Sequence, residues 1–331
     1  MTKEAQEKEK KLVRKPKNLV IRIKSGFIML VIVGAFLYFG PTSTFALCSL
    51  ISVLSFLEML RVCSKLLSND CSKKNTLLVL AKLSYVVLFL CRTLVTMAPL
   101  YPGKQLTVIV PFVPIIRLVL LTVLLSVFVY NLRRPHYKQM LIFFSAITVV
   151  LLLVHLVLES FSLVFSCAGW FFASICMVQL NDIGAYLVGA TIGRTKYIEV
   201  SPNKSLEGFI GGFFFTLLFT HLFGRLLMNL CTPYHTLQFS WALGFSNAHF
   251  WSQQVVLGVS RWQFGMIILS AFNSFISPTF GYIGSGIKRV MSLDDFGDLF
   301  PGHGGVTDRF DCCFIGMIFA KALYDAFINH Y

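Results

Sequence analysis

Long apolar segments alternate with short polar ones along almost the whole chain. The apolar segments are roughly 20 residues long, the length that a helix needs to cross a bilayer, and they lack the strict alternation of barrel strands. The pattern therefore predicts an all-α integral membrane protein, a polytopic helical bundle of about nine transmembrane helices. The predicted spans lie near residues 25–40, 42–62, 76–99, 106–130, 139–158, 161–180, 208–228, 262–284 and 312–328.

Two segments fit this pattern of spans in more than one way. The first span can begin as early as Leu19. The stretch 239–261 is apolar overall but carries several polar side chains, among them Asn247, His249 and Gln253. A span there would bury many polar groups in hydrocarbon, so we interpret the stretch as an interfacial or re-entrant element.

Composition and charge support a membrane protein. The chain is 56% hydrophobic and only 13% charged, whereas about 25% of the residues of soluble domains are charged. Nine Lys or Arg residues fall within the first 24 positions, and others follow the second, fourth and sixth predicted spans. The positive-inside rule places these segments in the cytosol and the C-terminus in the lumen. The net charge of +14 is therefore explained by the orientation of the chain in the membrane. The sequence shows no basic recognition helix, so this charge gives no support to a nucleic-acid partner.

The segment 285–311, SGIKRVMSLDDFGDLFPGHGGVTDRFD, concentrates polar chemistry between two apolar stretches. Carboxylates are costly to desolvate at a membrane boundary, so a cluster of them there indicates a cation, or a polyanion held through cations. Gly302, Gly304 and Gly305 allow positive φ and the close approach of a ligand. Five of the 15 acidic residues of the chain lie here: Asp294, Asp295, Asp298, Asp308 and Asp311.

A second polar segment, residues 181–212, reads NDIGAYLVGATIGRTKYIEVSPNKSLEGFIGG. We interpret Asn181 and Asp182 as the residues at which the preceding apolar span ends. Ser201 precedes a proline and resembles a helix N-cap, and helix N-termini attract anions. Lys204 would then lie in the first turn and neutralise a phosphate, with Ser205 as a hydrogen-bond donor. Glu207 would complete the cap, bind a metal or pair with Lys204.

Together the two segments closely resemble the signature of the phosphatidate cytidylyltransferases, the CDP-diacylglycerol synthases. Two departures stand out: Asp294 lies where the family usually has lysine, and Leu206 where tryptophan is common. The first 180 residues match the family only in being apolar and multipass. The matching residues are Ser285, Lys288, Arg289, Asp295, Pro301 to Gly305, Asp308, Arg309 and Asp311, and before them Asn181, Asp182, Ala185, Tyr186, Gly189, Gly193, Ser201, Pro202, Lys204, Ser205, Glu207 and Gly208.

The resemblance implies a reaction, a cofactor and roles for these residues. CTP and phosphatidic acid would give CDP-diacylglycerol and pyrophosphate, with Mg²⁺ and room for a second cation, in a homodimer of the endoplasmic reticulum membrane with its active-site loops in the cytosol. The predicted metal ligands are Asp308 and Asp311, then Asp182 and Asp295. The predicted catalytic residues are Lys204, Lys288, Arg289, His303, Asp308, Arg309 and Asp311, and the predicted substrate-binding residues are Asn181, Ser201, Ser205, Glu207, Ser285, Gly302, Gly304 and Gly305.

Two alternatives stay open at the level of sequence. A CTP-dependent polyprenol kinase or a related membrane cytidylyltransferase would use similar residues, but a kinase would release nucleoside diphosphate. A multipass transporter would bind a cation or an anion through charged loops, although transporters more often bury charge near the middle of their spans. The predicted organisation is a basic cytosolic N-terminal arm at 1–24, transmembrane helices at 25–180, and a catalytic transmembrane region at 181–331 with motif loops at 181–212 and 285–311.

Overall fold

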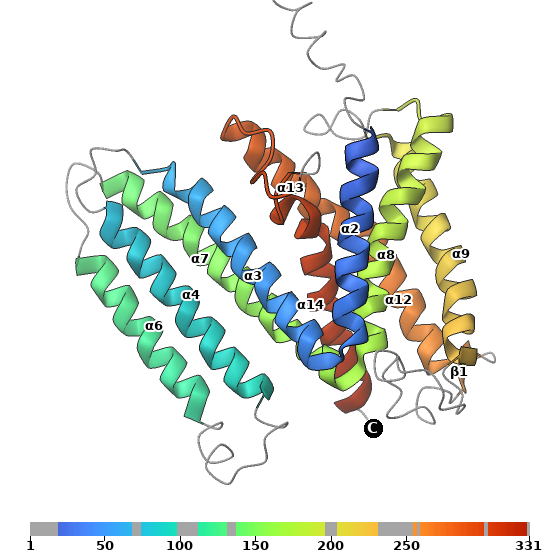
Figure 1. Ribbon diagram of the computed structural model, residues 1–331, viewed down its shortest axis with the longest axis horizontal. Helices are drawn as coiled ribbons and strands as arrows, with labels where there is room; N and C mark the ends of the chain where they lie inside the picture. The colour runs from blue at the N-terminus through green and yellow to red at the C-terminus, as the bar shows by residue number, and fades with distance from the viewer. Residues whose placement is uncertain are drawn as a thin grey trace, which may run out of the picture.

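A computed structural model describes residues 19–67, 74–97, 112–130, 137–195, 204–230, 254–256, 259–300 and 304–329. Within these ranges the chain is a bundle of long helices with one short β-hairpin (Figure 1). The helices are α2 (Leu19–Tyr38), α3 (Pro41–Ser64), α4 (Lys74–Met97), α6 (Val113–Tyr130), α7 (Tyr137–Ser160), α8 (Leu163–Ile192), α9 (Leu206–Leu230), α12 (Arg261–Phe275), α13 (Ser277–Val290) and α14 (Thr307–Asn329). The hairpin pairs β1 (Gln254–Val256) with β2 (Val259–Ser260) in antiparallel register.

Every predicted span overlaps one of these helices, with α12 and α13 together covering the predicted span 262–284. Five helical stretches of the described chain are long and apolar enough to cross a membrane. The multi-pass helical character is therefore confirmed, while the number nine stays a prediction. The five stretches are Thr42–Ser64, Lys74–Thr96, Lys138–Phe165, Trp170–Ile192 and Arg261–Val290.

The helices run alternately up and down in the view of Figure 1. The start of α2, the ends of α3 and α8 and the start of α9 lie at the upper end of the bundle. The end of α9 and the start of α12 lie at the opposite end, beside the hairpin. Residues 239–253 of the ambiguous segment lie outside the described residues, but the helices that flank it, α9 and α12, end and begin on the same side.

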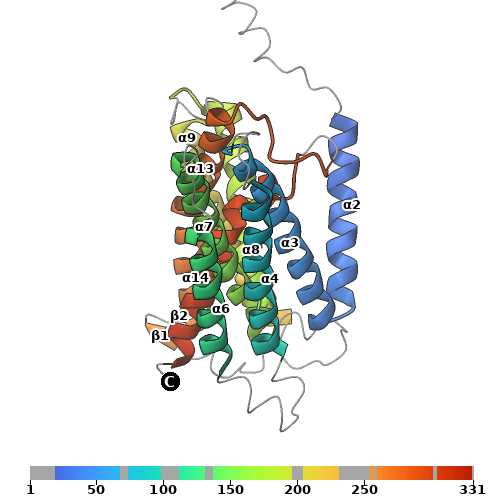
Figure 2. The ribbon, with the colours of Figure 1, turned by 90° about the vertical axis from the view of Figure 1, so that its left-hand side faces the viewer.

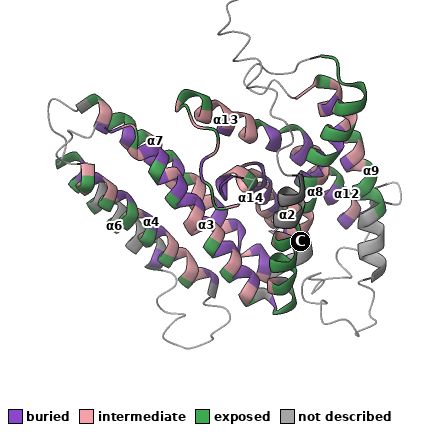
Figure 3. Ribbon diagram, turned by 45° about the horizontal axis from the view of Figure 1, so that its top comes forward, coloured by how far each residue is buried: buried purple, intermediate pink, exposed green. Residues whose placement is uncertain are grey.

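Two clusters of buried side chains hold the bundle together, and α3 and α7 contribute to both. In the first cluster Trp170 of α8 packs edge-to-face on Trp262 of α12, and its indole N–H donates to the carbonyl of Ala320 at 2.9 Å. In the second, the rings of Phe56 and Tyr85 stack with centroids 4.2 Å apart. Figure 3 shows buried residues on the inner sides of these helices and exposed ones outside, and α2 stands at the margin beside α3 (Figure 2).

Helix α8 is longer than the sequence pattern predicted. The prediction that Asn181 and Asp182 close a span is wrong, because the helix continues to Ile192 through the apolar sequence that follows. Helix α9 packs tightly along this extension. A Cβ atom at Gly208 of α9 would lie 2.6 Å from the carbonyl oxygen of Ala185, so only glycine allows the two backbones to come so close. Most of the predicted motif loop 181–212 is therefore helix, over residues 181–192 and 206–212.

The predicted span 262–284 is interrupted at Ile276, where α12 ends and α13 begins with Pro278 near its start. Proline suits the first turn of a helix, where its missing N–H removes no hydrogen bond. Helix α13 extends to Val290, and α14 begins at Thr307. The predicted loop 285–311 is thus helical at both ends and irregular only between them.

Candidate functional site

A buried ion pair joins the two ends of the 285–311 segment. The Lys288 ammonium of α13 lies 2.7 Å from Asp308 Oδ1 in the first turn of α14, and the side chains are 13% and 1% exposed. Asp308 Oδ2 accepts the backbone N–H groups of Phe296 at 2.8 Å and Gly305 at 3.0 Å. Three donors therefore surround the Asp308 carboxylate and draw α13, the intervening loop and α14 together.

A second buried carboxylate, which the sequence reasoning missed, fixes the same loop from a distant helix. Glu58 of α3 is 7% exposed and accepts the N–H groups of Val306 at 2.9 Å and Thr307 at 2.8 Å. These are among the N–H groups that the start of a helix leaves unpaired, so Glu58 caps α14 from outside. The signal that points to Glu58 is an acidic residue within an otherwise apolar span.

The glycines of the motif fit around these carboxylates. A Cβ atom at Gly305 would lie 2.5 Å from Glu58 Oε1, so a larger residue would displace the carboxylate. Gly304 has a φ of +85°, and its N–H and C=O both pair with Phe300. A Cβ atom at Gly304 would also lie 2.9 Å from the carboxyl carbon of Asp295, which therefore packs directly against this turn. The predicted residues Gly302 and His303 lie outside the described residues.

The start of α9 differs in detail from the sequence interpretation. Ser205 is the residue before the helix, and its hydroxyl accepts the N–H of Gly208 at 3.1 Å. Ser205 therefore caps the helix, and Lys204 precedes it instead of lying in its first turn. Ser201, the predicted cap, lies outside the described residues.

Glu207 ties this helix start to the end of α8. Its carboxylate accepts the backbone N–H of Arg194 at 3.1 Å and both the N–H and the hydroxyl of Thr195. The backbone N–H of Glu207 itself, followed by the Thr195 hydroxyl and the backbone N–H groups of Arg194 and Thr195, holds the pKa of Glu207 at about 2, well below its usual range. These contacts with Arg194 and Thr195 are a local structural role that differs from the three roles predicted for Glu207.

The two motif segments meet at Asp182 and Asp311. Lys204 lies 3.8 Å from Asp182 Oδ1 and 4.8 Å from the centre of the Tyr282 ring. The charge of Arg309 also acts on Asp182, and the charge of Asp182 acts on Asp311. Four charged groups from α8, α14 and the start of α9 therefore gather where the segments adjoin.

Helix α13 passes directly over Asp311. A Cβ atom at Gly284 would lie 3.2 Å from Asp311 Oδ2, and one at Gly281 would lie 3.8 Å from it. Asp308 also meets α13, through Lys288. The three-residue spacing predicted that Asp308 and Asp311 share one face of a helix, and this is confirmed, since both face α13.

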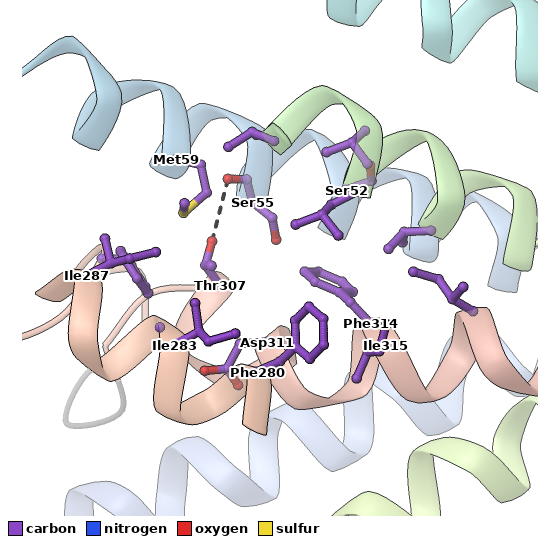
Figure 4. Close-up of a pocket in the computed structure, with 17 residues that line it drawn as sticks. Ser52, Ser55, Met59, Phe280, Ile283, Ile287, Thr307, Asp311, Phe314 and Ile315 are labelled. Carbon is purple, nitrogen blue, oxygen red and sulfur yellow. Dashed lines mark hydrogen bonds between the residues drawn. The ribbon is translucent and has the colours of Figure 1, made fainter. Parts of the chain in front are cut away.

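Two cavities of similar size lie on either side of α13. The first, of about 140 Å³, is lined by both polar and apolar groups and is called the polar cavity below; it is bordered by Asp182, Lys204, Ser205 and Tyr282, with Asn181 in its wall. The second, of about 130 Å³, lies between α3, α7, α13 and α14 and is almost entirely apolar (Figure 4). Asp311 borders the apolar cavity and interacts with Asp182 of the polar one. The charged cluster therefore lies between a polar and an apolar space.

Comparison with known proteins identifies the family. The model of the cytidylyltransferase family matches residues 20–327, which is nearly the whole chain. The chain belongs to the cytidylyltransferase family. The match also includes the apolar N-terminal half, where the sequence resemblance had found no specific motif.

Several relatives are similar to this chain over about 60% of its length. The phosphatidate cytidylyltransferase of Saccharomyces cerevisiae is 36% identical over 231 residues, 62% of this chain and 49% of the relative. Phosphatidate cytidylyltransferase 2 of Homo sapiens is 34% identical over 225 residues, 61% of this chain and 50% of the relative. A putative phosphatidate cytidylyltransferase of Schizosaccharomyces pombe is 31% identical over 225 residues. The chain thus spans about half the length of the relatives it matches.

The carboxylates of the two motifs differ in how well they suit a cation. Mg²⁺ is commonly held by one or two carboxylates together with substrate phosphates and water. Asp182 and Asp311 fit that arrangement, because each borders a cavity and the charge of Asp182 acts on Asp311. Asp308 fits less well, because Lys288 and two backbone N–H groups already surround it. Among the described residues no three acidic, histidine or cysteine side chains converge on one point, so part of the ligand set would have to come from the substrate.

The remaining predicted residues lie around this cluster rather than within it. Asn181 is 3% exposed, and its side-chain oxygen has no hydrogen-bond partner among the described residues. The Ser285 hydroxyl donates to the carbonyl of Gly281, one turn back in the same helix. Arg289 is exposed in the last turn of α13. A substrate that binds the Ser285 hydroxyl would have to replace or share its hydrogen bond to the carbonyl of Gly281.

Proposed function

We propose that this chain is a CTP:phosphatidate cytidylyltransferase, which makes CDP-diacylglycerol and pyrophosphate from CTP and phosphatidic acid. The observation that carries the proposal is the position of the Asp182 and Asp311 pair between a polar and an apolar cavity. Such an enzyme must join a water-soluble nucleotide to a membrane lipid, and the two spaces suit these two substrates. The names of the relatives support the same reaction.

The reaction requires the stabilisation of negative charge more than it requires proton transfer. A phosphate monoester has a second pKa of about 6, so the lipid phosphate is largely dianionic at neutral pH and needs no general base. Its oxygen forms a bond to the α-phosphorus of CTP, while the bond from that phosphorus to the bridging oxygen breaks and the electron pair leaves with pyrophosphate. The protein must therefore bring two anions together and stabilise the leaving group.

The residues around the polar cavity suit this work. Lys204 and Arg309 supply positive charge beside Asp182, and arginine offers a planar fork for two phosphate oxygens. Asp182 and Asp311 would hold Mg²⁺, which, when bound, neutralises charge on the triphosphate. Lys288 and Asp308 hold the loop that carries the Gly-rich turn, a positioning role supported by their burial.

The membrane arrangement proposed with this activity has nine spans, a cytosolic N-terminus and a cytosolic site. Basic residues lie at the upper end of the bundle in Figure 1, for example at the end of α3 and the start of α9. The end of α13 and the polar cavity lie at the same end, so the positive-inside rule supports a site in the cytosol. The resemblance to the family adds two parts to the proposal. The chain forms a homodimer in the endoplasmic reticulum membrane, and its site binds a second cation.

The proposal is tested with the purified chain in phosphatidic-acid vesicles, Mg²⁺ and CTP labelled on the α-phosphate. Label should pass into lipid with release of pyrophosphate, and Asp311→Asn and Asp182→Asn should each abolish it or raise the Mg²⁺ requirement strongly. The matched control is Asp325→Asn, which removes a carboxylate paired with Lys321 near the other end of α14 and should keep activity. Failure of the wild-type chain to label lipid while the γ-phosphate passes to an alcohol would instead indicate a kinase.

A further inference from the structure

The apolar cavity is built from four regular helix faces. Positions i, i+3, i+4 and i+7 lie on one side of a helix, and three of the four helices line the cavity with this spacing. The fourth, α3, supplies Ser52, Ser55 and Met59. The other lining residues are Val150, Leu153, Val154 and Val157 on α7, Phe280, Ile283, Gly284 and Ile287 on α13, and Asp311, Phe314, Ile315 and Ile318 on α14, with Phe296 and Thr307 beside them.

One lining residue of the cavity is charged. Asp311 is the only ionisable residue among the described residues that line it. Along α14 the lining runs from Thr307, one turn before Asp311, to Ile318, seven residues after it, which is about 10 Å beyond Asp311 at the rise of an α-helix. Figure 4 shows Thr307 to one side of Asp311 and Phe314 and Ile315 to the other, with Ser52 across the cavity. The space is therefore an apolar slot with one carboxylate, Asp311, part-way along its length.

The cavity also reaches the outer surface of the bundle. Ile283 lines the cavity and is 52% exposed, so the slot opens beside this residue. Ile283 belongs to the stretch Arg261–Val290, and Met59 on the facing wall belongs to Thr42–Ser64, both long and apolar enough to cross a membrane. Both walls of the slot therefore belong to helical stretches that can lie in the hydrocarbon of a bilayer.

We propose that this cavity holds an acyl chain of the phosphate-bearing lipid substrate and so sets the position of its headgroup beside Asp311. The inference rests on the proposed cytidylyltransferase activity and adds the place of the lipid. An acyl chain leaves one hydrocarbon environment for another, so entry gains little hydrophobic free energy. The cavity acts instead by orientation, because a headgroup misplaced by about 1 Å can lower a rate about 100-fold.

Neighbouring leucines on α7 provide a matched pair of variants. Leu153 lines the cavity, whereas Leu152 does not and is 58% exposed on the outer face. Leu153→Trp should fill the cavity and lower kcat/KM for dioleoyl phosphatidic acid at least about tenfold, but change it less than twofold for dihexanoyl phosphatidic acid. Leu152→Trp should leave both values unchanged. Ile315→Trp fills the cavity from α14 and should repeat the result, which guards against misfolding of one variant.

A binding measurement separates this inference from the proposed reaction. A phosphatidic acid with a photoreactive group in its acyl chain should label the wild-type chain at Phe314 or Ile315, and unlabelled phosphatidic acid should compete where phosphatidylcholine does not. Labelling without any transfer from CTP would sustain the cavity and overturn the reaction. Transfer from CTP with equal long-chain and short-chain effects in both filled variants would overturn the cavity, and so would equal competition by phosphatidylcholine.

Discussion

Replacement of Glu58 by glutamine tests whether a carboxylate on α3 organises the motif loop. Glu58 accepts two N–H groups from the start of α14, 248 and 249 residues away in sequence. A hydrogen bond to a charged acceptor contributes about 1.5–3 kcal/mol. Glutamine keeps one acceptor oxygen but turns an NH₂ group toward the second N–H, which is then left buried and unpaired. We expect a loss of about 2–3 kcal/mol in the local stability of this loop.

The expected loss converts directly into an exchange rate. Because about 1.4 kcal/mol is a tenfold change in an equilibrium constant, the amides of Val306 and Thr307 should exchange roughly 30 to 150 times faster in Glu58→Gln. Hydrogen–deuterium exchange of the purified protein in micelles measures this directly. Glu58→Ala removes both acceptors and should cost about 3–5 kcal/mol.

Glu159 on α7 provides the control for this comparison. It pairs with Arg92 at 3.5 Å but its side chain is 44% exposed, so Glu159→Gln should cost less than about 1 kcal/mol. It should not alter exchange at the start of α14. Equal exchange of Val306 and Thr307 in wild type and Glu58→Gln would refute the view that this carboxylate holds the loop.

Three further predictions concern the surrounding contacts. Asp308→Asn leaves Lys288 buried without its counter-charge and should lower the unfolding free energy by about 3–5 kcal/mol, whereas the double variant with Lys288→Met should recover part of it in a denaturant titration. The pKa of Glu207 is lowered to about 2 from an ordinary 4.5, so its stabilising effect is fully present above pH 4.5 and is lost as the pH falls toward 2. Acid unfolding of Glu207→Gln should lack this part of the transition. An acid unfolding profile equal to that of the wild type would contradict the assignment. Gly208→Ala places a Cβ atom against the backbone of α8 and should cost about 1–3 kcal/mol, while Gly34→Ala, which meets nothing within 4 Å, should leave the thermal midpoint unchanged or higher.

The helical elements, and the residue types that gather at the candidate site, could be predicted from the sequence alone. Runs of apolar residues about 20 long can satisfy their backbone in a bilayer only as helices, so the spans were predictable from local composition. The two motifs were equally local, and the family assignment agrees with them. Local patterns were less reliable at element ends, as α8 and the break at Ile276 show. Helix α8 continues past two polar residues into apolar sequence, and a new helix begins near Pro278 within an apolar run.

Only the tertiary structure decided which polar groups meet. The spacing of Asp308 and Asp311 predicted one shared helix face, but not that Lys288 and two backbone N–H groups would surround one carboxylate while the other borders an apolar cavity. Glu58 contacts a loop 248 residues away, and no local periodicity encodes such a contact. The reason is physical: a helix is specified by neighbours three and four residues apart, whereas a site is specified by the packing of helices that the chain brings together only when it folds.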